Sequence, residues 1–228
     1  MGTRISSFDR FGNRPAALAH ARESETVLHW YDFTCPFCYV AQQRNTILVN
    51  HGLEVVELPF QAHPDIPQGG IAVGSRTGPR YAVLEREARD AGLPLNWPPR
   101  IPNSRRALAA AEWCRRHQPA CFPQLHRELF AAHFVLGEDL EDQLVIDRHA
   151  SGSGVHLARL HVGLGDGAAM AAVGSAEALA HDSGVEGPPA WLFPQGPLLG
   201  LHAASDFERL ADEAARRDLR QGTSVRRL

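Results

Sequence analysis

The chain has 228 residues, of which 44% are hydrophobic and 21% charged, as in an ordinary globular protein. A net charge of −3 leaves no basic field to draw the chain to nucleic acid or to an anionic membrane. Four cysteines are too few for a disulfide scaffold, so a closely spaced pair indicates catalysis or metal binding.

No membrane partner and no signal peptide are expected. No stretch approaches the roughly 18 apolar residues that a membrane-spanning helix needs. Charged residues are spread through residues 1–25 and leave no room for the apolar core of a signal peptide. We therefore treat residues 1–25 as an N-terminal extension and predict a cytoplasmic protein.

The first strong elements are two strands around one helix. Residues 27–33 are rich in β-branched and aromatic side chains, which predicts a strand. A helix over 36–50 follows, with Pro36 in its first turn, and then a second strand over 53–60. This order predicts a right-handed parallel unit.

The middle of the chain is predicted to be mainly helical after a stretch rich in Pro and Gly over 62–103. Asn103 or Ser104 is expected to cap the helix at 105–117. The predicted helices lie at about 80–91, 105–117, 123–136, 141–150, 155–164 and 168–181.

Two short strands and a helix close the chain. Strands at 190–193 and 198–201 are separated by a turn, which predicts an antiparallel hairpin on the same sheet. Ser205 and Glu208 form a capping-box pattern at the start of the last helix.

The motif Cys35-Pro36-Phe37-Cys38 lies where the first strand meets the first helix. A helix start presents unpaired N–H groups and a partial positive charge, which stabilise a thiolate there. Cys38 lies three residues after Cys35, on the same face and near enough to close a disulfide ring. The pattern predicts thiol–disulfide exchange, in which one thiolate attacks a substrate and the other resolves the mixed disulfide.

Other interpretations involve the two remaining cysteines. Cys114 and Cys121 can complete a zinc site with the motif, but six residues separate them, beyond the usual spacing of two to four. We therefore predict no metal. They are also a candidate second redox pair, with Arg115 and Arg116 favouring a thiolate at Cys114. Alternatively Cys114 is a core residue, and the first motif too can hold two inert thiols.

The segment YDFTCPFCYVAQQR resembles the active-site segment of the DsbA-like thioredoxin-fold family, and in particular its cytosolic FrnE-type branch. The segments LPFQAHPDIPQGG, IPNSRRALAAAEW and GVEGPPAWLF are also similar to that branch, so the likeness spans about residues 26–216. The resemblance implies an α/β protein with a thioredoxin-like fold that carries an inserted all-helical domain.

The same resemblance implies a division of the chain. Residues 26–62 and 185–218 form the discontinuous thioredoxin-like domain, and residues 63–184 form the helical insertion domain. Residues 219–228 form a C-terminal tail.

The resemblance also implies roles for single residues. Cys35 is the attacking thiol, Cys38 the resolving thiol, and Pro189 matches the family's cis-proline, which lies against them. The alternative for Pro188-Pro189 is a simple turn that leads into a strand.

Substrate contacts are assigned to Pro36, Phe37 and Pro188. Pro188 has no N–H, so it can offer a substrate backbone only its carbonyl, and we expect weakened peptide binding. Phe37 stands where tryptophan is common in this branch. His29 and Asp32, on the strand that leads to Cys35, are candidate proton acceptors for the exchange.

The predicted function is exchange between the Cys35/Cys38 dithiol or disulfide and protein or peptide disulfides. No bound cofactor is needed, and glutathione or a cellular dithiol is a candidate electron exchange partner. A glutathione-dependent isomerase or transferase, of the 2-hydroxychromene-2-carboxylate isomerase or kappa type, is the enzymatic alternative, although such relatives typically carry Ser at position 35. A holdase that binds unfolded chains is the non-enzymatic alternative. The oligomeric state is open, with a homodimer among the options.

Overall fold

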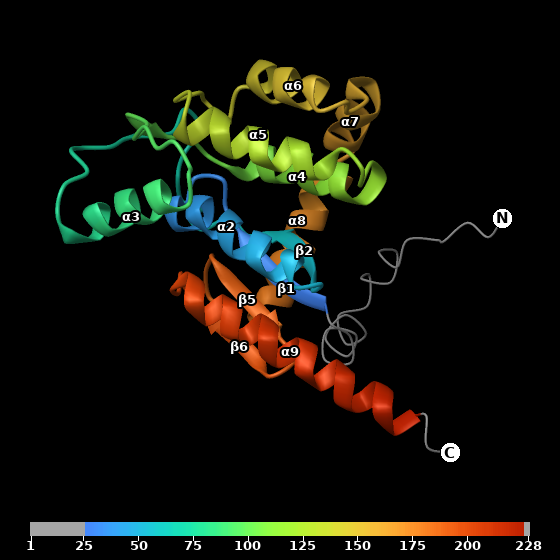
Figure 1. Cartoon of the computed structure of the whole chain (residues 1–228). Coiled ribbons are helices and arrows are strands. Elements are labelled where there is room, and N and C mark those ends of the chain that lie inside the picture. The colour runs from blue at the N-terminus through green and yellow to red at the C-terminus, as the bar shows by residue number, and fades with distance from the viewer. Residues whose placement is uncertain (1–25, 226–228) are drawn as a thin grey trace.

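A four-stranded mixed sheet forms the centre of the computed structural model, which describes residues 26–225 (Figure 1). The expected N-terminal extension, residues 1–25, lies outside this range. Strands β1 (Thr26–Tyr31) and β2 (Glu54–Pro59) run parallel, and β5 (Ala190–Phe193) and β6 (Gly196–Leu199) form an antiparallel hairpin. Since β5 also pairs with β1, the strand order is β2-β1-β5-β6. The predicted parallel unit and closing hairpin are confirmed, although β6 lies two residues earlier than the strand predicted at 198–201.

Helices cover both faces of the sheet because alternate residues of β1 point to opposite sides. Val27 packs with α2 (Pro36–Asn50) and α9 (Ala204–Val225) on one face. Leu28 and Trp30 pack with α8 (Ala168–Asp182) on the other face. The Trp30 indole also donates a hydrogen bond of 3.0 Å to the Ala176 carbonyl of α8. All six residues of β1 are buried, which places the end of this strand in the core.

The segment between β2 and β5 is mainly helical. Apart from α8, which packs on the sheet, its helices lie toward one end of the molecule, while α9 lies at the other (Figure 1). Besides α8 it contains α3 (Pro79–Asp90), α4 (Arg105–His117), α5 (Phe122–Phe134), α6 (Gln143–Gly152) and α7 (Leu157–Gly165). It also contains a two-stranded antiparallel sheet of β3 (Ile71–Ala72) and β4 (Arg100–Ile101), which was not predicted from the sequence. Strands of two residues each are too short to show any periodicity.

The predicted division into domains stays a prediction. The insertion is joined to the sheet through α8, and α9 continues past residue 218, where the tail was expected to begin. The predicted capping box is wrong, because α9 already begins at Ala204 and Ser205 lies inside its first turn. At α4 the cap position is Ser104, whose side chain makes no capping bond, and the Asn103 carboxamide oxygen accepts the Arg105 N–H at 3.0 Å.

Across the part of the chain that the structure describes, no helix has the length and apolar character needed to cross a membrane.

Candidate functional site

Cys35 occupies the position immediately before the first turn of α2. Its backbone is extended, with φ −86° and ψ 115°, and Pro36 stands in the first helical turn. The Cys35 N–H donates to the Asp32 carbonyl at 3.1 Å, and the Cys35 carbonyl accepts the Tyr39 N–H at 3.1 Å. These two bonds hold the cysteine between the end of β1 and the start of the helix, where unpaired N–H groups favour a thiolate.

The two thiols of the motif are free, but their surroundings differ. Cys35 is partly exposed, whereas Cys38 is completely buried and hydrogen-bonded to Cys35. The Asp32 N–H also donates to the Cys38 sulfur at 3.5 Å. Burial is the main cause that raises the pKa of Cys38 well above its ordinary value, and the bond to Cys35 adds to it. Cys38 is therefore protonated at neutral pH and is a poor first nucleophile.

Pro188 and Pro189 lie against this pair although they are distant in sequence. The Pro188–Pro189 peptide bond is cis. The Cys35 thiol donates to the Pro188 carbonyl at 3.9 Å, while the Pro189 carbonyl accepts the Gly200 N–H at 2.9 Å. The second bond ties this segment to the end of the hairpin, so the sheet fixes the carbonyl that faces Cys35.

Asp32 organises the turn between β1 and Cys35. One carboxylate oxygen accepts the Thr34 N–H and hydroxyl, both at 3.0 Å, and the other accepts the Ala62 N–H at 2.8 Å. Burial raises the pKa of Asp32, and these hydrogen bonds oppose the shift. His29, the other candidate proton acceptor, stacks on Trp191 with ring centroids 4.6 Å apart. Asp32 is thus the titratable group in the same turn as the thiols.

A cavity of about 420 Å³ opens beside Cys35. Cys35, Pro36, Phe37 and Pro188 line it together, whereas Pro189 is buried. The sequence reasoning missed the rest of the wall, because it comes from the Pro- and Gly-rich segment and from α3, where no local pattern marks a site. Those lining residues include Ala62, His63, Val73, Arg76, Arg80, Tyr81, Leu84 and Ile101.

The second pair of cysteines is arranged differently from the first. The Cys114 thiol donates to the Gln118 carbonyl at 3.6 Å, and the Cys121 thiol donates to the Gly154 carbonyl at 3.5 Å. Both thiols are free, and their pairing as a redox couple stays a prediction.

The expected activation of Cys114 by its neighbouring arginines is wrong. Burial, with the charge of Cys121, raises the pKa of Cys114 to about 12. Arg115 and Arg116 instead hold the buried Glu112, with N–O distances of 2.7 and 2.5 Å. Both arginines therefore pair with the Glu112 carboxylate instead of stabilising a thiolate at Cys114.

Within the described residues, no group of three or more His, Cys, Asp or Glu side chains is arranged to hold a metal ion. The chemistry that this arrangement offers is that of one accessible thiol with a second, buried thiol directly behind it.

The strand–helix–strand unit, the closing hairpin and the thiol pair at a helix start define a thioredoxin fold. Residues 26–215 match the family described as "DSBA-like thioredoxin domain", so the chain belongs to the DsbA-like thioredoxin family. A comparison with curated proteins found no match.

Solved structures with the same fold come from several bacteria. A probable DsbA oxidoreductase from Streptomyces coelicolor is 22% identical, with a TM-score of 0.72 over 83% of this chain and 89% of that one. The cytosolic disulfide reductase DsbM from Pseudomonas aeruginosa, solved with GSH, is 18% identical, with a TM-score of 0.62 over 86% of this chain and 98% of that one.

A 2-hydroxychromene-2-carboxylate isomerase shares the fold as well. It is 22% identical, with a TM-score of 0.66 over 88% of this chain and 98% of the isomerase. At these identities the likeness establishes the fold, and the activity has to be argued from the site.

Proposed function

We propose that the protein exchanges the Cys35/Cys38 dithiol or disulfide with protein or peptide disulfides. The observation that carries the proposal is a partly exposed thiol at a helix start, beside a cavity, with a second thiol buried behind it. The DsbA-like family typically lacks a tightly bound cofactor, which fits chemistry carried by two sulfurs.

The reaction proceeds in two displacements. The Cys35 thiolate attacks one sulfur of the substrate disulfide, forms a mixed disulfide and releases one substrate thiolate, which takes a proton from water. Cys38 then loses its proton to a base, for which Asp32 is the titratable group in the same turn. Its thiolate attacks the Cys35 sulfur and releases the second substrate thiolate. The protein is oxidised by two electrons and the substrate is reduced, and a cellular dithiol or glutathione returns the protein to its reduced form.

Trapping tests this proposal. In Cys38→Ser the second displacement is blocked, so a mixed disulfide through Cys35 accumulates and is detected by mass spectrometry of the intact protein. Cys114→Ser is the matched control, because it also removes a buried thiol and should leave turnover intact. Full turnover by Cys38→Ser, with no mixed disulfide trapped on Cys35, would contradict the proposal.

A glutathione-dependent isomerase is the second candidate, favoured by the shared fold of the 2-hydroxychromene-2-carboxylate isomerase. Such an enzyme needs no resolving thiol, so its activity should survive in Cys38→Ser. Assaying that variant for isomerisation of 2-hydroxychromene-2-carboxylate with added glutathione separates the two functions.

The FrnE-type branch and a cytoplasmic location also belong to the proposal. One structural neighbour is a cytosolic reductase by its description, and another, from Salmonella enterica, is periplasmic. Fractionation of cells that express the full chain, with a cytoplasmic and a periplasmic marker protein as controls, decides the location.

A further inference from the structure

The cavity beside Cys35 carries positive charge that thiol exchange itself does not require. Its wall contains Arg76 and Arg80, and no Asp or Glu is among the described residues that line it. The whole chain, by contrast, has 26 acidic residues against 23 Lys and Arg. The positive lining is therefore a local property of this cavity.

Aromatic rings rather than carboxylates hold the two arginines. The Arg80 Cζ lies 4.9 Å from the centroid of the Phe37 ring, and the Arg76 Cζ lies 4.9 Å from that of Trp97. Arg76 also donates to the Pro98 carbonyl at 3.3 Å, but neither arginine has an ion pair within residues 26–225. Stacking orients a guanidinium and leaves most of its N–H groups free for another partner.

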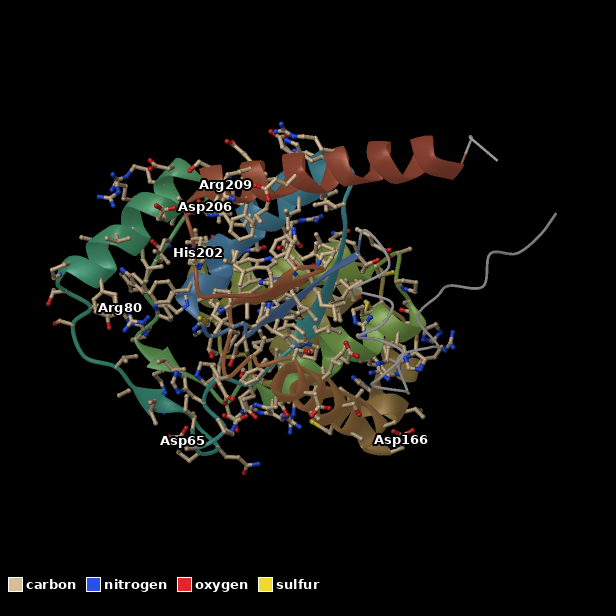
Figure 2. The ribbon with its side chains drawn as sticks, turned by 90° about the horizontal axis from the view of Figure 1, so that it is seen from below. Asp65, Arg80, Asp166, His202, Asp206 and Arg209 are labelled. Carbon is tan, nitrogen blue, oxygen red and sulfur yellow. The ribbon has the colours of Figure 1, made fainter. Side chains whose placement is uncertain are left out.

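Neither arginine is explained by the stability of its own segment. Arg80 stands in the first turn of α3, as Figure 2 shows, where a cation meets the positive end of the helix dipole. Burial lowers the pKa of Arg76, because desolvation disfavours its charged form. Each arginine thus carries a local electrostatic cost at its position, which is expected where a residue serves a site.

We propose that this cavity selects disulfides whose sulfur atoms are flanked by carboxylates, and that Arg76 and Arg80 bind those carboxylates. The inference rests on the proposed function, because selection matters only for a disulfide that reaches Cys35. A guanidinium pairs with a carboxylate through two parallel N–H bonds. Acidic cysteine-containing peptides and glutathione both carry carboxylates. Both can therefore pair with the guanidinium groups of Arg76 and Arg80.

A single turnover isolates the selective step. One equivalent of reduced protein and one of RSSR give the Cys35–Cys38 disulfide and two RSH, so two electrons move and no further reductant is needed. The probes are symmetrical peptide disulfides of equal length with blocked termini, in which Glu, Gln or Lys flanks the cysteine. Each rate is divided by the rate of the same probe with dithiothreitol, which removes the probe's intrinsic reactivity.

The wild-type protein should react about fivefold or more faster with the Glu probe than with the Gln probe at low salt, and the ratio should fall as salt rises. In Arg76→Gln/Arg80→Gln the ratio should approach one. In Arg80→Glu the preference should turn toward the Lys probe, an outcome that a merely distorted site does not produce.

Arg86→Gln is the matched control, since Arg86 is an exposed arginine of the same helix that does not line the cavity. Its Glu-to-Gln ratio should equal that of the wild type. A wild-type preference for the Glu probe that persists unchanged in the double variant, or an equal loss of that preference in Arg86→Gln, would overturn the inference.

Oxidised glutathione as a further probe separates the two sources of carboxylates. Selection is read as a rate that falls in the Arg76→Gln/Arg80→Gln variant. If this rate falls with glutathione alone, the cavity serves a small acidic thiol, and if it falls with the Glu peptide alone, the cavity serves acidic peptides. If it falls with neither, the inference is overturned. If no probe is reduced at all, the proposed function fails. Calorimetric binding of the S-methylated Glu and Gln peptides then still decides whether the cavity prefers carboxylates.

Discussion

The two cysteine pairs share a local plan. In each pair one partly exposed cysteine directly precedes a helix with proline in its first turn, Cys35 before α2 and Cys121 before α5. The other member of each pair, Cys38 or Cys114, is completely buried and has a raised pKa. A helix start and a buried partner thiol therefore do not by themselves distinguish a reactive pair.

The surroundings of the exposed thiol differ between the pairs. Cys35 lines the cavity and faces the Pro188 carbonyl, and its partner thiol is in the same helical turn. The thiol of Cys121 points instead to the Gly154 carbonyl, and Cys114 is on the preceding helix. An accessible thiol and a partner thiol within one turn therefore make the first pair the better candidate for exchange.

The sharpest test of this comparison replaces the exposed member of each pair. Cys35→Ser should lower the rate of disulfide exchange by about a thousandfold or more, because a hydroxyl does not replace the attacking thiolate. Cys121→Ser should leave the rate within about twofold. Stopped-flow reduction of a peptide disulfide measures both rates. An equal loss of rate in the two variants would show that the two exposed cysteines do not differ in reactivity.

The pH dependence of the second displacement should follow the buried thiol of the first pair. Because the pKa of Cys38 is raised, its thiolate fraction at neutral pH is small. As long as the pH stays below that pKa, the fraction rises tenfold for each unit by which the pH increases. The release of the second substrate thiol should therefore speed up about 100-fold from pH 6 to pH 8. A chromogenic aromatic disulfide reports both releases in one trace.

Cys114→Ala is the control for this profile. It removes the other thiol of raised pKa and should leave the pH dependence unchanged. A flat profile in the wild-type protein would mean that ionisation of Cys38 does not limit the second displacement.

The surroundings of the second pair can be disturbed without touching the first. A Cβ at Gly163 of α7 would lie 2.2 Å from the Trp113 Nε1, next to Cys114 in the sequence. Gly163→Ala should lower the free energy of unfolding by about 1–3 kcal/mol, since the tryptophan ring has to move. Denaturant unfolding measures the change.

Gly165→Ala is the matched control in the same helix, because a Cβ there meets nothing within 4 Å. It should leave stability unchanged or slightly raised. The rate of exchange at Cys35 should be the same in both variants, and a slowed rate in Gly163→Ala alone would show that the two regions are coupled.

The smallest expected effect concerns Pro188, which has no counterpart near Cys121. Pro188→Val adds an N–H where a substrate backbone can pair, so the Kd for a peptide disulfide should fall about threefold to tenfold. Affinity is measured with the Cys35→Ser form of each protein, in which no exchange occurs. An unchanged Kd would mean that bound peptides do not use this backbone position.

Local sequence patterns determined the elements and the fold. The helices at 36–50 and 105–117 and the strand at 190–193 have the predicted bounds, because periodicity, proline and capping act within a few residues. The α/β thioredoxin-like fold and the DsbA-like family, recognised from the motif and its neighbouring segments, are confirmed.

The surroundings of Cys35 follow from tertiary packing and not from local sequence. Pro188 lies 153 residues away in the chain, and Arg76 and Arg80 come from a segment whose prolines and glycines carry no periodic signal. Asp32 meets the Ala62 N–H only because β1 and β2 lie side by side. Such contacts depend on how the helices and the sheet pack as a whole, and no short stretch of sequence contains that information.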